Sequence, residues 1–183
     1  MEVDLGKHGF GRLLAFGYPE SYYDKPLTKT LFAQLNFDIA NNGDFYVSFE
    51  ADSLMYRYDH DYNQLACFGF AGRDMDLNYL RWDSYDQPWK ERLAERMSRG
   101  FYNAVEYVDE TGLLFRSYRK GGGSVTDGLQ VYRDGVLVGD VDVPLGFRMA
   151  GYVDPYYYSY VVPDEEGERL YMFRFKWPSA PEE

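Results

Sequence analysis

Residues 35–69 alternate short apolar segments with turn-forming residues, and no other part of the chain constrains the fold as strongly. Four strands are predicted there, at residues 37–39, 45–49, 54–58 and 65–68. Asn42-Gly43 separates the first two and is typical of a two-residue hairpin, in which both central residues adopt positive φ. Phe45, Val47 and Phe49 alternate with polar or aromatic neighbours, as expected for a strand with two different faces. A four-stranded antiparallel meander of this size is the unit of a β-propeller blade.

The same pattern recurs along the rest of the chain. Further strands are predicted at residues 102–108, 113–118, 128–132, 136–143, 147–153, 156–162 and 169–175. Asp134-Gly135 indicates a second tight hairpin. The blade-like repeats span approximately 30–72, 101–145 and 146–177, which is about the spacing that propellers show. We therefore expect residues 1–183 to form a single all-β domain of about three blades in an incomplete ring.

An up-and-down β-barrel is the competing architecture, because about ten to twelve predicted strands with one helix also suit it. Three blades alone cannot easily close a propeller, since closed propellers typically have four to eight. The uncovered blade faces would then need a partner. A second copy of the chain, forming a homodimer, and further blades outside this sequence are the two candidates for completing the ring.

One helix is predicted at residues 88–99, inserted between the first two repeats. Pro88 suits a first helical turn and Gly100 suits the C-terminal end. Trp89, Leu93 and Met97 follow one another at every fourth position and predict a single apolar stripe.

Composition excludes several classes of function. The chain has 19% aromatic residues, which favour β structure, and a formal charge of −11, which argues against binding to nucleic acid or anionic membranes. No segment approaches the ~18 apolar residues of a membrane span, and the N-terminus lacks the apolar region of a signal peptide. Cys67 is alone, which excludes an intrachain disulfide, and its apolar strand predicts a buried thiol.

No catalytic or metal-binding motif stands out, and no cofactor is expected. Asp74 and Asp76 begin like a calcium-binding EF-hand loop, but Tyr79 and Tyr85 occupy the positions that require Gly and Glu. Asp59-His60-Asp61 is interpreted as a solvated turn rather than an acid–base site. Two arginines raise a further alternative that stays open: Arg116 and Arg119, near Asp109 and Glu110, would form either a charged site in a channel or cross-strand salt bridges.

The aromatic residues provide the candidate ligand-binding set. It comprises Trp82, Tyr85, Trp89, Tyr156, Tyr157 and Tyr158. Consecutive aromatic residues in a strand must face both of its sides, so some of them would be exposed. Flat aromatic surfaces suit sugars or peptides, whereas packing between blades or against the helix is the alternative role.

Several segments resemble a known family. "FDIANNGDFYVSFEADSLMYRYDHDYNQLACFGFAGRD" combines a turn with Gly43, the strand pair Tyr46-Val47, a Tyr56-Arg57-Tyr58-Asp59 strand and a glycine-punctuated end. "YNAVEYVDETGLLFRSYRK" and "YYYSYVVPDEEGERLYMFRFKW" resemble later blades of the same kind. Over roughly residues 30–177 the chain resembles the C-terminal half of the six-bladed, TolB-like β-propeller lipoproteins of Bacteroidales, a family of unknown function.

This resemblance implies a periplasmic or cell-surface location, although the lipoprotein signal and its lipidated Cys are absent from this sequence. It implies no catalytic residues. We therefore expect a non-enzymatic module that binds a protein or glycan ligand. Two alternatives remain: a carbohydrate-active hydrolase or lyase that uses loop carboxylates such as Asp74, Asp76 or Asp83, and a barrel that binds a small apolar ligand.

Overall fold

The computed structural model describes residues 2–4, 11–14, 34–79, 88–164 and 166–178. The chain begins with a two-stranded ribbon of β1 (Glu2–Asp4) and β2 (Gly11–Leu14). This ribbon is a sheet of its own and does not join the sheets that follow.

The first sheet is the predicted four-stranded meander, here named blade 1. Its strands are β3 (Leu35–Ile39), β4 (Phe45–Phe49), β5 (Met55–Tyr58) and β6 (Gln64–Phe68). They pair antiparallel in sequence order. The predicted strands in this segment are confirmed.

The first turn of blade 1 differs from the prediction. Only Gly43 has positive φ, at 87°, and the strands pair up to Ile39 and Phe45, so the connection is longer than two residues. The amide of Ala40 donates to the carbonyl of Asp44 over 2.9 Å, which closes the loop. The side chain of Asn42 accepts a hydrogen bond from the Asp44 amide at 3.0 Å instead of adopting the left-handed conformation.

The second sheet, blade 2, is also a four-stranded meander. It contains β7 (Gly100–Val108), β8 (Leu113–Lys120), β9 (Thr126–Arg133) and β10 (Val136–Pro144). Asp134 and Gly135 have φ values of 50° and 79°, and Arg133 pairs directly with Val136. The two-residue hairpin that was predicted here is confirmed.

The third sheet, blade 3, has three strands. They are β11 (Met149–Val153), β12 (Tyr156–Ser159) and β15 (Arg174–Phe175). The strand predicted at 169–175 is interrupted: β14 (Leu170–Tyr171) pairs with β13 (Val162–Pro163) in a separate ribbon. Only the end of that segment joins blade 3, through pairing of Phe175 with Tyr157.

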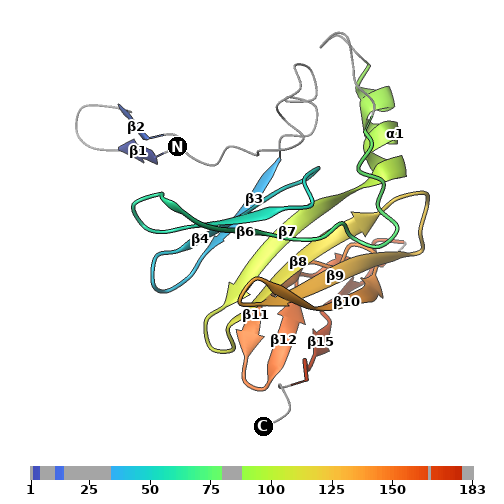
Figure 1. Cartoon of the computed structure of the whole chain (residues 1–183). Helices are drawn as coiled ribbons and strands as arrows, with labels where there is room; N and C mark the ends of the chain where they lie inside the picture. Colours follow the sequence, from blue (N-terminus) through green and yellow to red (C-terminus); the bar gives the residue numbers. More distant parts are fainter. Residues whose placement is uncertain (1, 5–10, 15–33, 80–87, 165, 179–183) are drawn as a thin grey trace.

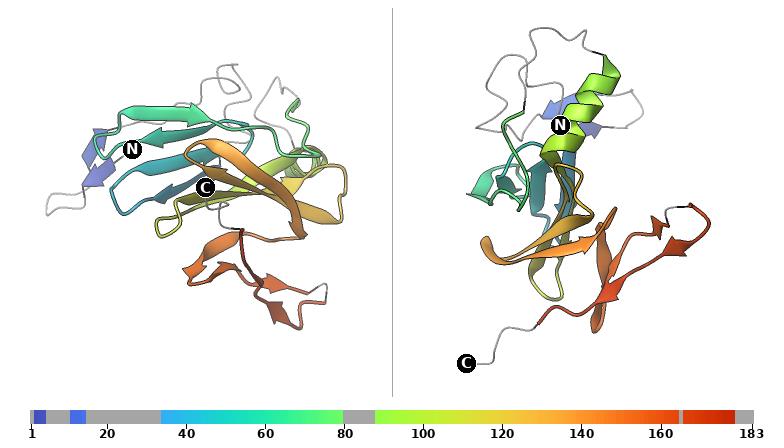
Figure 2. Two further views of the ribbon diagram at one scale, coloured as in Figure 1. Left: turned by 60° about the horizontal axis from the view of Figure 1, so that its bottom comes forward. Right: turned by 90° about the vertical axis from the view of Figure 1, so that its right-hand side faces the viewer.

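The three sheets follow one another in a row, as blades do in a propeller (Figures 1 and 2). Their first strands, β3, β7 and β11, lie next to each other. Asp38 of β3 accepts a hydrogen bond from the Tyr107 amide of β7 at 2.7 Å, and Asn36 donates to the Tyr102 carbonyl. The fold is all-β and propeller-like with one inserted helix. Within the described residues no sheet closes into a barrel, so the barrel alternative is wrong.

Two apolar cores hold the row together. Between blades 1 and 2, Tyr46 and Met55 pack against Leu114 and Tyr132. Between blades 2 and 3, the buried residues come from both sheets: Val108, Leu113, Phe115, Leu129, Val131, Phe147, Met149 and Tyr157. These cores explain the high aromatic content, because a blade presents large side chains to both neighbours.

The predicted helix is present as α1 (Trp89–Arg99), with Pro88 one residue before its first turn. Its apolar stripe is not packed against the sheets: Trp89, Leu93 and Met97 are 64%, 38% and 37% exposed. A polar side faces the protein instead, because Glu95 is buried and Arg96 pairs with Glu50 of blade 1 at 2.7 Å. In the described part of the chain, no helix has the length and apolar character needed to cross a membrane.

Cys67 is exposed, so the expectation of a buried thiol is wrong. It lies on β6, the last strand of blade 1, and is paired with Tyr56 of β5. Apolar composition alone suggested burial, but an edge strand leaves part of its surface open to solvent.

Candidate functional site

A groove of about 400 Å³ follows the first strands of the three blades, where a complete propeller has its central channel. Its polar side chains include Asp38 of β3, Glu106 of β7, and Arg148, which immediately precedes β11. Tyr160, at 56% exposure, lies at its border.

Glu106 is the most perturbed acid of this groove. Burial raises the pKa of Glu106 to about 7, and the negative charge of Asp38 contributes to the same effect. At neutral pH this carboxyl group is therefore present in both protonation states. The groove offers the carboxyl groups of Asp38 and Glu106, which can hydrogen-bond to a polar ligand as acceptors and, when Glu106 is protonated, as a donor.

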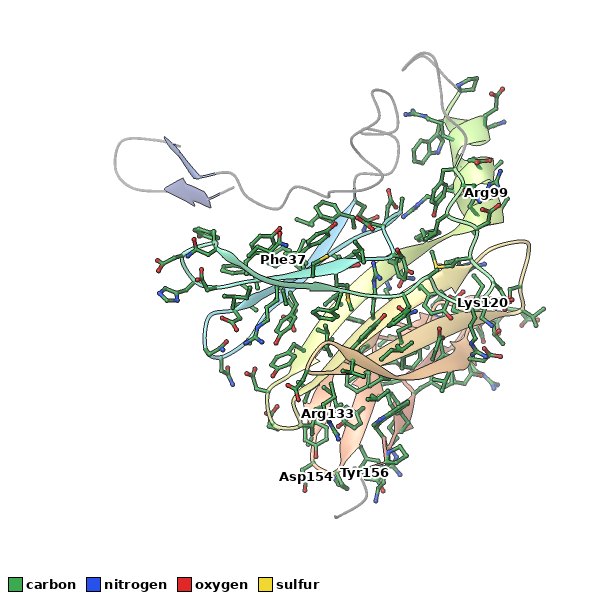
Figure 3. The ribbon with its side chains drawn as sticks, in the orientation of Figure 1. Phe37, Arg99, Lys120, Arg133, Asp154 and Tyr156 are labelled. Carbon is green, nitrogen blue, oxygen red and sulfur yellow. The ribbon has the colours of Figure 1, made fainter. Side chains whose placement is uncertain are left out.

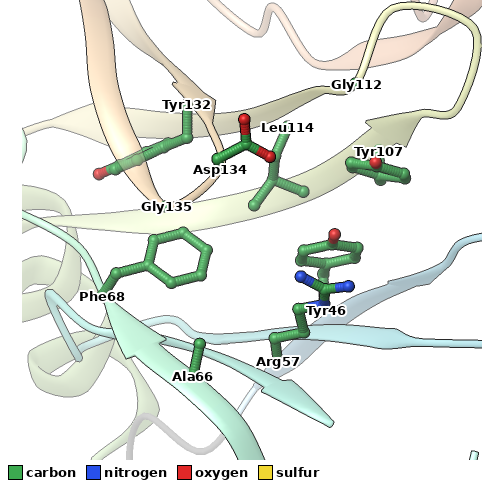
Figure 4. A pocket seen from close by; sticks show the side chains of 10 residues that line it. All are labelled: Tyr46, Arg57, Ala66, Phe68, Tyr107, Gly112, Leu114, Tyr132, Asp134 and Gly135. Carbon is green, nitrogen blue, oxygen red and sulfur yellow. The ribbon is translucent and has the colours of Figure 1, made fainter. Parts of the chain in front are cut away.

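A second cavity, here called the inter-blade pocket, opens between blades 1 and 2 and has a volume of about 190 Å³ (Figure 4). Phe68 and Tyr132 lie on one side, and Tyr46 and Tyr107 lie on the other. The rings of Tyr46 and Tyr107 stack with centroids 4.5 Å apart, whereas those of Phe68 and Tyr132 are 5.6 Å apart and tilted. The pocket thus has aromatic walls on two sides.

The inter-blade pocket also holds two charged groups of opposite sign. Arg57 donates through Nε to Asp44 over 2.8 Å, and this hydrogen bond is the main reason that the pKa of Arg57 is raised. Among the described residues, Nη1 of Arg57 has no hydrogen-bond partner. The carboxylate of Asp134, in the tight hairpin of blade 2, likewise has none there and is exposed. Sequence reasoning missed both residues because they come from hairpins of different blades.

The predicted aromatic residues do not form one surface. Tyr157 is buried in the core between blades 2 and 3, whereas Tyr156 and Tyr158 are on the opposite face of β12. Arg174 covers the Tyr156 ring at 4.7 Å. Trp89 is exposed at the start of α1. Trp82 and Tyr85 lie outside the described residues.

The loop carboxylates considered for hydrolysis are engaged in ion pairs. Asp74 pairs with Lys120 at 3.2 Å, and Asp76 pairs with Arg99. Asp83 lies outside the described residues. Within the part of the chain that the structure describes, no cluster of three or more His, Cys, Asp or Glu side chains is placed to hold a metal ion.

The remaining charged residues singled out in the sequence make contacts within the fold or lie in an exposed turn. Arg116 is fully buried and directs its guanidinium into blade 1, and Arg119 lies 3.5 Å from Asp127. Neither arginine meets Asp109, which accepts a hydrogen bond from the Asn41 amide at 3.0 Å. Arg119 of β8 thus forms a cross-strand salt bridge with Asp127 of β9, as the second alternative predicted, whereas Arg116 is enclosed in the interior and lines no channel. His60 is exposed in its turn, as predicted.

The outer faces of blades 1 and 3 expose apolar groups at opposite ends of the row. Leu35, Phe37 and Ile39 are 46%, 56% and 48% exposed. They pair with Phe49, Val47 and Phe45, so they share the face of the sheet that points away from blade 2. We call this surface end face 1; Cys67 belongs to it through its pairing with Tyr56.

At the other end, the far side of blade 3 carries Val153, Tyr156, Tyr158 and Arg174, which we call end face 3. Val153 is 66% exposed. Phe37 and Tyr156 mark the two ends of the row in Figure 3. Both ends thus present side chains of the kind that fill the cores between neighbouring blades.

Comparison with known proteins supports the fold and leaves the activity undefined. No protein-family model and no curated protein matches the chain. A solved structure does: the crystal structure of a member of the DUF4221 family from Bacteroides vulgatus superposes with a TM-score of 0.56 at 9% sequence identity. The match covers 80% of this chain and 46% of the other, so this chain spans about half the length of that protein. At this identity the likeness shows a common fold with a Bacteroides protein from a family of unknown function.

Proposed function

We propose that this chain is a non-enzymatic β-propeller-type interaction module, and that its two end faces are covered by protein in the functional state. The single observation that carries this proposal is the exposed row of Leu35, Phe37 and Ile39 on the first strand of blade 1. In a propeller this surface packs against the preceding blade. Val47, Phe49 and Tyr56 of the same face are already buried, so the exposed apolar part is the β3 row with its neighbours, and exposed apolar surface of this kind marks an interaction site.

The occupant we propose is a second copy of the chain. End face 1 of one copy would pack on end face 3 of the other, and the reverse contact would close a ring of six blades. Such a ring has two identical interfaces related by a two-fold axis. The length of the Bacteroides protein, about twice that of the matching region, supports a ring of this size. A periplasmic or cell-surface location and the single-domain organisation of residues 1–183 belong to the same proposal.

The candidate ligand set of Trp82, Tyr85, Trp89, Tyr156, Tyr157 and Tyr158 remains a prediction. Tyr156 and Tyr158 belong to end face 3, so in the closed ring their contacts would be with the second copy. We expect Tyr156 and Tyr158 to pack against side chains of the second copy rather than to bind a free ligand.

Light scattering on the purified chain tests the proposal. We expect a dimer for the native chain and a monomer for Phe37→Asp and for Val153→Asp, because each substitution places a charge in both interfaces. Val125→Asp is the matched control, since Val125 is 82% exposed in the loop between β8 and β9 and belongs to neither end face. Thermal melting establishes that each variant is folded.

Mixing the two monomeric variants separates the ring from other dimers. A mixed pair contains one interface with both substitutions and one with neither, so the mixture should recover dimers. In a dimer that joins two copies of end face 1, Val153→Asp would remain dimeric, and that result would overturn the ring. A native chain that stays monomeric up to about 100 μM would overturn the proposed second copy.

Cys67 provides an independent readout because it belongs to end face 1. We expect its labelling by a maleimide to slow as protein concentration rises through the dimerisation range. Labelling in Phe37→Asp should be fast at every concentration.

A further inference from the structure

We propose that the inter-blade pocket binds a neutral pyranose ring, either as a free monosaccharide or as one unit of a glycan. This site goes beyond the proposed function, because all of its residues belong to blades 1 and 2 of a single copy. Binding there requires no second chain.

The size and walls of the pocket suit a single sugar ring. A volume of about 190 Å³ is the space that about six molecules of liquid water occupy, which admits a small ring and excludes drug-sized ligands. Phe68 lies on one side of the cavity and the stacked pair of Tyr46 and Tyr107 on the other, with the Arg57 guanidinium 5.7 Å from the centre of the Tyr46 ring (Figure 4). A pyranose carries apolar C–H groups on its ring faces, which can pack against the Phe68 ring.

The polar groups at the pocket supply both kinds of hydrogen-bonding partner that a sugar hydroxyl needs. Nη1 of Arg57 is a donor and the Asp134 carboxylate is an acceptor. Among the described residues, neither group has a hydrogen-bond partner. The guanidinium of Arg57 is held by Asp44, so the donor is fixed before any ligand arrives. Asp134 is positioned by the tight hairpin that pairs Arg133 with Val136.

The charge balance selects a neutral ligand over an anionic one. Arg57 contributes one positive charge, whereas Asp44 and Asp134 contribute two negative charges. The side chain of Asp44 lies against Arg57 and already neutralises it. An incoming carboxylate would meet a net negative site in a protein whose formal charge is −11, while a neutral polyol would not be repelled.

The test uses the full chain and saturation-transfer NMR with a panel of D-glucose, D-galactose, D-mannose and N-acetyl-D-glucosamine. Glucuronate and L-glutamine serve as anionic and zwitterionic comparison probes. We expect saturable binding of at least one neutral sugar with a Kd of about 1 mM, and weaker binding of glucuronate. Absence of saturable binding for all four sugars up to about 50 mM overturns the proposal, as does a preference for glucuronate or glutamine.

Two variants locate the binding to the pocket. Asp134→Asn removes the charged acceptor and should weaken binding at least about tenfold, the effect of losing one hydrogen bond to a charged group. Asn tolerates the positive φ of this position, so the hairpin is preserved. Ala66→Leu, on the β6 residue that pairs with Arg57, should abolish binding by filling the cavity.

Matched controls are Asp61→Asn, in an exposed turn, and Ala94→Leu, on the exposed surface of α1. Neither should change the affinity. If Ala66→Leu fails to fold, the Asp134→Asn result decides alone. Undiminished binding in Asp134→Asn overturns the assignment of the site. The sugar-binding test requires no dimer. A negative result there therefore does not affect the proposed ring, and a monomeric chain would not affect the proposed sugar site.

Discussion

The guanidinium carbon of Arg116 lies 3.2 Å from the centre of the Tyr102 ring, in the interior between blades 1 and 2. Both side chains are fully buried. Nη1 of Arg116 donates to the Ser53 carbonyl at 2.7 Å and Nε donates to the Ser48 hydroxyl at 2.8 Å. The cation is thus enclosed by blade 1 carbonyls on one side and an aromatic ring on the other, which offsets much of its desolvation.

Replacing this cation should be among the most destabilising single changes in the chain. Arg116→Met leaves several buried blade 1 carbonyls without a donor, and we expect a loss of about 3–5 kcal/mol in the free energy of unfolding. Urea denaturation followed by tyrosine fluorescence measures it. Arg133→Met, the same substitution at the end of β9, should change the free energy by less than about 1 kcal/mol. Equal effects for the two variants would contradict the role given to Arg116.

Position 128 requires glycine because the Tyr118 ring packs directly against its Cα. A Cβ at this position would be 1.9 Å from Cζ of Tyr118, its cross-strand partner on β8. Gly128→Ala should therefore displace Tyr118 and disrupt its 2.6 Å hydrogen bond to Asp140, at a cost of about 1–3 kcal/mol. The double variant with Tyr118→Ala should be less destabilised than the sum of the two single variants, because the clash is then gone. Additive costs in urea denaturation would refute the steric explanation.

Glu106 should make stability depend on pH. Its pKa rises from 4.5 to about 7 on folding, so between these values the folded chain binds more protons than the unfolded chain. Stability from this group is complete below about pH 4.5 and is lost as pH rises through 7. The free energy of unfolding of Glu106→Gln, relative to that of the native chain, should therefore be about 1–2 kcal/mol higher at pH 8 than at pH 4.5. This figure is reduced because Glu106 is partly accessible to solvent. A difference that is the same at both pH values would exclude this contribution.

The exposed helix stripe should contribute little to the stability of the fold. Trp89→Gln and Leu93→Gln should alter the free energy of unfolding by less than about 0.5 kcal/mol, because both side chains are exposed. Thermal melting provides the measurement. A fall in melting temperature comparable to that of Arg116→Met would mean that the stripe is packed after all.

Local patterns predicted the strands of blades 1 and 2 well, because alternation and turn residues act over a few neighbours. Asp134-Gly135 was predicted correctly since both residues adopt positive φ. The Asn42-Gly43 prediction failed because the Asn42 side chain hydrogen-bonds to the Asp44 amide, and this alternative has the same sequence signature. Burial was harder to predict: the apolar pattern suggested that Cys67 and the helix stripe are buried, but both are exposed.

The candidate sites depend on relations between blades, which no local pattern encodes. Arg57 and Asp134 are separated by most of blade 2 and the inserted helix, and only the packing of two hairpins brings them to one pocket. Glu106 acquires its perturbed pKa from burial near β3. The sequence-based search favoured consecutive aromatic residues instead, and most of those serve different surfaces.

The burial of Arg116 in blade 1 also imposes a direction on biosynthesis. Each sheet is a meander of consecutive strands, so a blade can complete its hydrogen bonds while later residues are still on the ribosome. Blade 1 is synthesised first, and its carbonyls within residues 49–54 are the hydrogen-bond acceptors of Arg116. Without blade 1, blade 2 would have to bury the Arg116 guanidinium without the acceptors that its N–H groups need. The sheet that accepts the hydrogen bonds of Arg116 is therefore synthesised before the sheet that donates them.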